Sequence, residues 1–266
     1  MNNHTEEQLL RKMIEFLAQE AGESLKVEGK TVEELKAKWR GLVNIRQPKV
    51  APAEYVTLEN EYLKEYHAPR VQTLADCLST TNDQIKLYYG DLCELKVDAI
   101  VNAANSEMLG CFIPMHTCID NQIHTFAGIQ LREECNSKMN DLRKLYGNNY
   151  EQPTAIPMLT DAYNLPAKKV IHIVGPIVES KLTAKKENEL ALCYENVLDM
   201  CLENGLRSVA FCCISTGVFR FPNRRAAQIA TSTVEKWCTK NHDAMDRIVF
   251  NVFKDEDREY YEEFLQ

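Results

Sequence analysis

The spacing of apolar residues changes from a helical to a strand-like period about a third of the way along the chain. In the first part, apolar residues recur three and four positions apart, as on one buried helix face. These positions are Leu9, Leu10, Met13, Ile14 and Leu17, then Val32, Leu35, Trp39 and Leu42. Thr31 and Glu34 form a capping-box signature at the start of the second helix. Pro48 and Pro52 mark a connection to a polar helix expected over about 54–67.

The second part of the chain alternates short apolar runs with helical patterns. Strands are predicted at 85–89, 97–101, 170–174, 208–214 and 248–253, and helices at about 121–140, 187–203, 223–239 and 257–266. The adjacent Cys212 and Cys213 would point to opposite faces of a strand, which indicates a sheet covered on both sides. Strands alternating with helices predict a three-layer α/β/α domain. We therefore expect an N-terminal helical extension over 1–80 and this α/β domain over 81–266.

Composition and charge limit which partners and which cellular compartment we expect for this protein. The chain has 266 residues, a net charge of −8 and 45% hydrophobic residues. This charge disfavours duplex nucleic acid and anionic membrane surfaces as partners. The charged, amphipathic start does not resemble a signal peptide, and no apolar run is long enough for a membrane span. We expect a cytoplasmic protein whose ten cysteines are reduced, so a cysteine cluster is first interpreted as metal-binding or catalytic.

Two short polar segments follow predicted strands. In Gly90-Asp91-Leu92, the carboxylate can accept a hydrogen bond from an exocyclic amine, although such a pair is more often a plain turn. Asn102 and Asn105 follow a buried apolar run, and in open α/β sheets ligands lie beyond the carboxyl ends of strands. Side-chain amides can hold sugar hydroxyls because each offers a donor and an acceptor. Taken alone, both asparagines are better explained as turn formers.

Three soft metal ligands lie close together in the segment after Gly110. Cys111, His116 and Cys118 suit zinc, because thiolate and imidazole are its preferred ligands. Three protein ligands are typical of catalytic sites, which keep a position open. The alternatives are three unligated side chains, or a closed structural site completed by His124 or Cys135.

Two further features stand at predicted helix starts. Asp120 begins the helix after the Cys/His segment, where it could be an N-cap, face a ligand, or do both. Ser215-Thr-Gly-Val-Phe219 lies between a buried strand and a helix, where successive backbone N–H groups can hold an anion. Gly217 supplies conformational freedom in this segment. These residues predict a diphosphate-binding loop.

The order of these motifs resembles the macrodomain family. From about Gly90 to Phe253 the chain carries, in sequence, GDL, VDAIVNAANS, IDNQIHTFAG, AYNLPAKKVIHIVGP and ISTGVF, a set that is specific only as a whole. The Cys/His segment replaces a glycine-rich stretch, as in the zinc-containing macrodomains of bacteria and some fungi. The resemblance implies a mixed six-stranded sheet between helices and an ADP-ribose cleft at the strand ends.

The resemblance also implies roles for individual residues. Asn105 and Asp120 match the family's catalytic positions, and Cys111, His116 and Cys118 match the ligands of one zinc ion. The positions that match substrate-binding residues are Asp91, Leu92, Asn102, Asn105, Ile119, Asp120, Ser215, Thr216, Gly217, Val218 and Phe219.

The activity implied is hydrolysis of mono-ADP-ribose from modified proteins, at the anomeric carbon of the distal ribose. Asn105 would orient the ribose, and Asp120 would position or deprotonate water. Zinc would either activate water or anchor a ribose hydroxyl. The alternatives are a non-catalytic reader of ADP-ribose and a purely structural zinc.

Overall fold

The computed structural model describes residues 3–24 and 27–266. Its N-terminal part consists of three helices, α1 (Asn3–Ala21), α2 (Val32–Ile45) and α3 (Ala53–His67). The capping box at Thr31 is confirmed: its side chain accepts from the Glu34 backbone, and the Glu34 side chain accepts from the Thr31 backbone. These helices, called the extension below, enclose their own core around Leu10, Trp39 and Tyr62.

A mixed sheet forms the centre of the rest of the molecule. Its strands are β1 (Leu78–Ser79), β2 (Ile85–Tyr89), β3 (Ala99–Ala104), β4 (Met158–Asp161), β5 (Lys169–Val174), β6 (Ser208–Phe211) and β7 (Arg247–Val252). The order is β1-β2-β7-β6-β3-β5-β4, with the two edge strands antiparallel to their neighbours and the rest parallel. The expected number of six strands was wrong. The sequence pattern located five strands and missed the two at the sheet edges, β1, which has only two residues, and β4.

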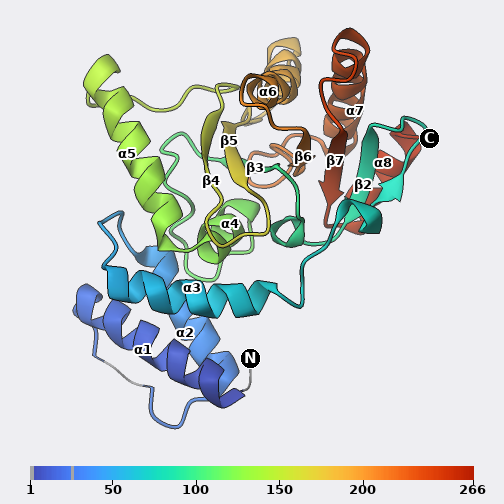
Figure 1. The fold of residues 1–266 in the computed structure, drawn as a ribbon. Helices are drawn as coiled ribbons and strands as arrows, with labels where there is room; N and C mark the ends of the chain where they lie inside the picture. The colour runs from blue at the N-terminus through green and yellow to red at the C-terminus, as the bar shows by residue number, and fades with distance from the viewer. Residues whose placement is uncertain (1–2, 25–26) are drawn as a thin grey trace.

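Helices cover both faces of the sheet, which confirms the three-layer architecture. They are α4 (Ile119–Ala127), α5 (Ile129–Tyr146), α6 (Ala184–Glu203), α7 (Asn223–Lys240) and α8 (Asp255–Phe264). Figure 1 shows α4 and α5 on the side of the extension, and α6, α7 and α8 on the opposite side. The single helix expected over 121–140 is two helices. Gly128 interrupts it with φ 98°, a conformation that glycine adopts without steric cost.

The fourth predicted strand ends earlier than expected. Its ladder to β7 ends at Phe211, so Cys212 and Cys213 lie beyond the strand. Both cysteines line one cavity, described below, and the prediction that the strand continues to residue 214 was wrong.

The extension packs against α4 and α5 through polar and apolar contacts. Glu59 of α3 accepts a hydrogen bond from Ile129 N, the first residue of α5, at 2.8 Å. Ile129 itself belongs to the core of the extension. Among the described residues, no helix is long and apolar enough to cross a membrane.

Candidate active site

A cavity of about 360 Å³ opens at the carboxyl ends of the parallel strands. This is where ligands bind in open α/β sheets, and the volume lies within the range of small-molecule sites. Most of the predicted substrate-binding residues line it: Asp91, Leu92, Ile119, Ser215, Thr216, Gly217, Val218 and Phe219. The predicted residues therefore form three walls of the cavity, one from the segment after β2, one from the start of α4 and one from the loop after β6.

The loop after β6 is held in a constrained conformation. Ser215 has φ 66°, in the left-handed region that side chains other than glycine rarely adopt. Gly217, expected to provide the conformational freedom, has no positive φ and open space around it. A Cβ on Gly175 would overlap Ser215 Oγ, so glycine at the end of β5 allows the loop to approach. Strained backbone of this kind is concentrated at ligand-binding sites.

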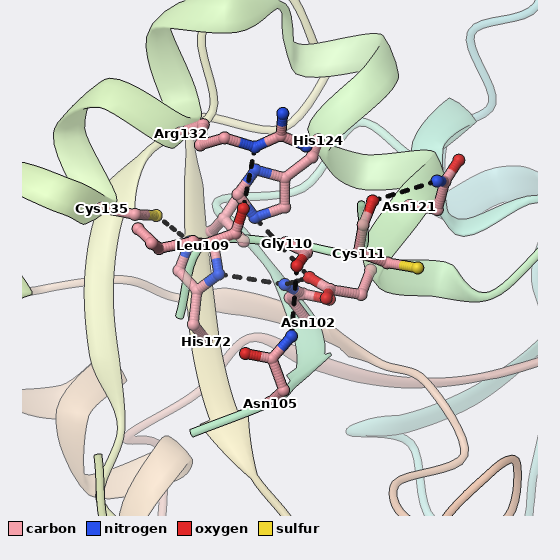
Figure 2. Close-up of polar contacts among 12 residues, drawn as sticks. Asn102, Asn105, Leu109, Gly110, Cys111, Asn121, His124, Arg132, Cys135 and His172 are labelled. Carbon is pink, nitrogen blue, oxygen red and sulfur yellow. Dashed lines mark hydrogen bonds and ion pairs between the residues drawn. The ribbon is translucent and has the colours of Figure 1, made fainter. Parts of the chain in front are cut away.

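Asn102 lies within β3 rather than after it, because the strand continues to Ala104. Its side chain is fully buried and does not line the cavity. Its Nδ2 donates to Asp120 Oδ1 at 2.8 Å. The same nitrogen lies 3.0 Å from His172 Nδ1 on β5 (Figure 2). The amide nitrogen can only donate, so His172 Nδ1 accepts. The structure thus gives Asn102 contacts that position Asp120.

Asp120 stands in the first turn of α4 and is only 5% exposed. Burial raises the pKa of its carboxyl to about 6, although the hydrogen bond from Asn102 favours the charged form. The expectation that Asp120 might be the N-cap was wrong: Cys118 is the N-cap, with its side chain accepting from Asn121 N. Asp120 does not line the cavity, although its neighbour Ile119 does.

Asn105 follows β3 and stabilises the turn that leads to the Cys/His segment. Its Nδ2 donates to Gly110 O at 3.2 Å, and its Oδ1 accepts from Glu107 N at 3.0 Å. Asn105 does not line the cavity in this structure. Gly110, at φ 83°, faces the His124 ring so closely that a Cβ would lie 2.7 Å from it. Glycine at this position therefore allows the turn to pack against α4.

The Cys/His loop, residues 111–118, brings its three predicted ligands together. Ligand atoms of Cys111, His116 and Cys118 all lie within 4.8 Å of one another, and all three residues are half-buried. Cys111 Sγ lies 3.6 Å from His116 Nδ1. A tetrahedral zinc ion with ordinary bond lengths separates such a sulfur and nitrogen by about 3.6 Å. The donor set and its spacing fit zinc, and Cys118 also lines the cavity.

The residues considered for closing the metal site lie elsewhere. His124 and Cys135 gather with His172 in a separate buried group between α4, α5 and β5. Figure 2 shows Cys135 beside His172 and the Cys111 sulfur pointing away from both. Burial lowers the pKa of His172 to about 3, so its ring is neutral. Its Nε2 lies 3.0 Å from Thr160 Oγ1, which accepts the remaining ring proton.

Comparison with known proteins agrees with this geometry. A family model described as "Macro domain" matches residues 101–230. A protein-ADP-ribose hydrolase of Treponema medium is 45% identical over 237 residues, covering 88% of this chain and 88% of that protein. The chain belongs to the macrodomain family. A second relative, a protein-ADP-ribose hydrolase of Staphylococcus aureus (strain MSSA476), is 41% identical over 233 residues, covering 87% of this chain and 85% of that protein.

A solved macrodomain has the same fold. The Trypanosoma brucei macrodomain in complex with ADP-ribose superposes with a TM-score of 0.65 at 30% identity, over 85% of this chain and 95% of that one. The agreement supports the macrodomain architecture of the sheet and its covering helices.

Several cavity residues of this macrodomain were missed from the sequence. They are Gly90, Ala103, Thr117, Gln122, Gly175, Cys212, Cys213, Asn251, Phe253, Lys254 and Asp257. Phe253 and Lys254 directly follow β7, so the strand-end rule applied to Asn102 could have found them. Phe253 is 74% exposed and Val218 is 71% exposed at the same cavity. Exposed apolar side chains at a cleft suit a flat, weakly polar ligand group.

Proposed function

We propose that this macrodomain is a hydrolase that removes mono-ADP-ribose from modified proteins. The bond cleaved joins the anomeric carbon of the distal ribose to an amino-acid side chain. One observation carries the proposal: a single cavity is lined by Asp91, by the Ser215–Phe219 loop and by Cys118 of the Cys/His loop. Two relatives at 45% and 41% identity are named protein-ADP-ribose hydrolases, which supports the same activity here.

The binding roles follow from the chemistry of each wall. Asp91 would accept from the adenine amine, with Leu92 adding a backbone contact and Phe253 an apolar surface. The Ser215–Phe219 loop would hold the diphosphate through backbone N–H groups, as anion-binding loops do. Ile119 would lie along the path from the diphosphate to the distal ribose. These assignments place the anomeric carbon on the side of the cavity formed by Cys118.

The Cys/His loop would hold one zinc ion through Cys111, His116 and Cys118. Once bound, the ion would supply Lewis-acid chemistry, by polarising a ribose hydroxyl or by activating water. The fit rests on three soft donors with an S···N separation of 3.6 Å. His124 and Cys135 are not part of this group, which leaves the proposed coordination open on the protein side.

The catalytic contribution of the polypeptide is assigned to Asp120 and Asn105. Glycosidic cleavage builds positive charge on the sugar, and the Asp120 carboxylate would stabilise that charge and orient water. Asn102 and the neutral His172 hold the carboxylate in place. Asn105, through its bond to Gly110 O, would keep the root of the Cys/His loop against the ribose.

A turnover assay tests this proposal. A mono-ADP-ribosylated protein incubated with zinc-loaded enzyme should lose its label. The Asn105→Ala enzyme should release the label much more slowly while still binding free ADP-ribose. A non-catalytic reader would bind ADP-ribose and leave the label in place. That result would overturn the hydrolase assignment.

We also place the protein in the cytoplasm. Support comes from its ten cysteines, all of which are free thiols in the structure. Such usage is typical of reducing compartments.

A further inference from the structure

Two side chains of the extension reach the Cys/His loop. Arg40 and Asn44 are four residues apart on α2, so they project from the same helix face. Arg40 Nη2 donates to His116 O at 2.7 Å. Asn44 Oδ1 accepts from Met115 N at 2.9 Å. Adjacent backbone groups of the loop are thus bound by a helix about 70 residues upstream.

Asn121 extends these contacts across the loop. Arg40 Nη2 also donates to Asn121 Oδ1 at 2.9 Å, which turns the amide nitrogen of Asn121 towards the loop. That nitrogen donates to Cys111 O at 3.2 Å and to Ile113 O at 3.0 Å. Asn121 N donates to Cys118 Sγ at 3.4 Å. One hydrogen-bond network therefore joins α2 to the segments that carry all three predicted ligands.

Buried hydrogen bonds fix the position of α2 against α4 and α5. Asn44 is 1% exposed, and its Nδ2 donates to Thr125 Oγ1 of α4 at 2.9 Å. The buried Arg132 donates from Nη1 to the carbonyls of Val43, Asn44 and Arg46 at 3.0, 3.1 and 2.6 Å. A cation at the C-terminal end of a helix is favourable because unpaired carbonyls gather there. Arg132 Nε donates to Leu109 O, two residues before the loop.

The Cys/His loop has little regular structure of its own to stabilise its conformation. It has no helix or strand, its centre at 113–115 is exposed, and Met115 adopts φ 60°. Ordering such a segment costs conformational entropy, and a ligand that requires the ordered form binds more weakly by that cost. Contacts that order the loop beforehand therefore strengthen binding at its ligands.

We propose that the extension is a positioning element of the metal site, in which Arg40 and Asn44 hold the Cys/His loop in its ligand-ready conformation. This rests on the zinc assignment made under the proposed function. The role goes beyond completing the fold, because the contacts fall on the backbone between the ligands.

Zinc affinity and amide exchange together test the proposal. Zinc dissociation constants are measured by competition with a chromophoric chelator for wild type, Arg40→Ala and Asn44→Ala. Each variant should bind zinc about 10- to 100-fold more weakly, the usual effect of removing an outer-shell partner. In metal-free protein, the Met115 amide should exchange faster with solvent in Asn44→Ala, since its acceptor is gone.

Arg11→Ala is the matched control. Arg11 Nη1 donates to Val27 O, a backbone carbonyl inside the extension. The substitution therefore removes an arginine-to-carbonyl hydrogen bond that does not involve the Cys/His loop. Zinc affinity in this variant should equal that of wild type. Unchanged affinity and unchanged Met115 exchange in Arg40→Ala and Asn44→Ala, with melting temperatures near wild type, would overturn the proposal. A wild type that binds no zinc would instead refute the zinc assignment, while the exchange measurement would still decide whether α2 orders the loop.

Discussion

The side-chain amide of Asn102 joins Asp120 to His172 by donating to Asp120 Oδ1 at 2.8 Å and facing His172 Nδ1 at 3.0 Å. The three residues come from β3, α4 and β5, and all are buried. The amide nitrogen can only donate, so Nδ1 of the neutral His172 accepts and its ring proton lies on Nε2. The carboxylate of Asp120 is thereby held from the interior side of the domain, by two residues that do not line the ligand cavity.

Replacing Asn102 with alanine should therefore impair turnover more than binding. A hydrogen bond to a charged group contributes roughly 1.5–3 kcal/mol, which corresponds to about 10- to 100-fold in kcat. The Kd for ADP-ribose, measured by calorimetry, should stay within about threefold, because Asn102 does not line the cavity. A large rise in Kd with normal kcat would show that Asn102 contacts the ligand directly.

Gly175→Ala should disturb the loop at Ser215. The new Cβ would overlap Ser215 Oγ, and relief of such overpacking costs about 1–3 kcal/mol. We expect ADP-ribose affinity to fall about tenfold or more. Adding Ser215→Gly should recover part of it, since glycine also accepts the φ of 66°. Gly41→Ala is the control: nothing lies within 4 Å of its Cβ position, so affinity should not change. Equal affinity in Gly175→Ala and wild type would contradict this account of the loop.

Removing zinc with a chelator should stop turnover without unfolding the protein. The main hydrophobic core is built from the sheet and its covering helices, and the Cys/His loop contributes none of its buried residues. We expect label release to fall at least about 100-fold and to return when zinc is restored. Circular dichroism should stay unchanged, and ADP-ribose should still bind through the adenine and diphosphate walls. Loss of the folded signal on chelation would favour a structural zinc.

The buried Glu59 should make stability depend on pH. Burial raises its pKa from 4.5 to about 7, so between these values the folded protein binds a proton that the unfolded chain releases. Stability is therefore highest below pH 4.5 with respect to this group, and it falls as pH rises through 7, by roughly 3 kcal/mol. Urea unfolding at pH 5 and pH 8 should show a smaller decrease for Glu59→Gln than for wild type. Parallel decreases in the two proteins would refute the assignment to Glu59.

The sequence by itself determined the alternation of strands and helices in the α/β domain and one of the loops that line the cavity. The Thr31–Glu34 capping box, the alternation of strands and helices, and the Ser215–Phe219 loop are local patterns. Tertiary packing does not change which residues take part in them. Cys111, His116 and Cys118 were also recognisable as a possible ligand group, because three residues of metal-ligating type lie within eight positions of one another. In each case the controlling interactions lie within a few residues of one another.

Only the tertiary structure decided how far each strand extends and what reaches the site from a distance. Asn102 belongs to a strand because β3 pairs with β5 through Ala104, and Cys212 leaves its strand because pairing with β7 stops at Phe211. Such ladder ends depend on hydrogen bonds between segments about 40–70 residues apart. The contact of Arg40 with the Cys/His loop spans 76 residues and has no local signal. Packing of the extension on α4 creates it, and that packing is not encoded in any one stretch of sequence.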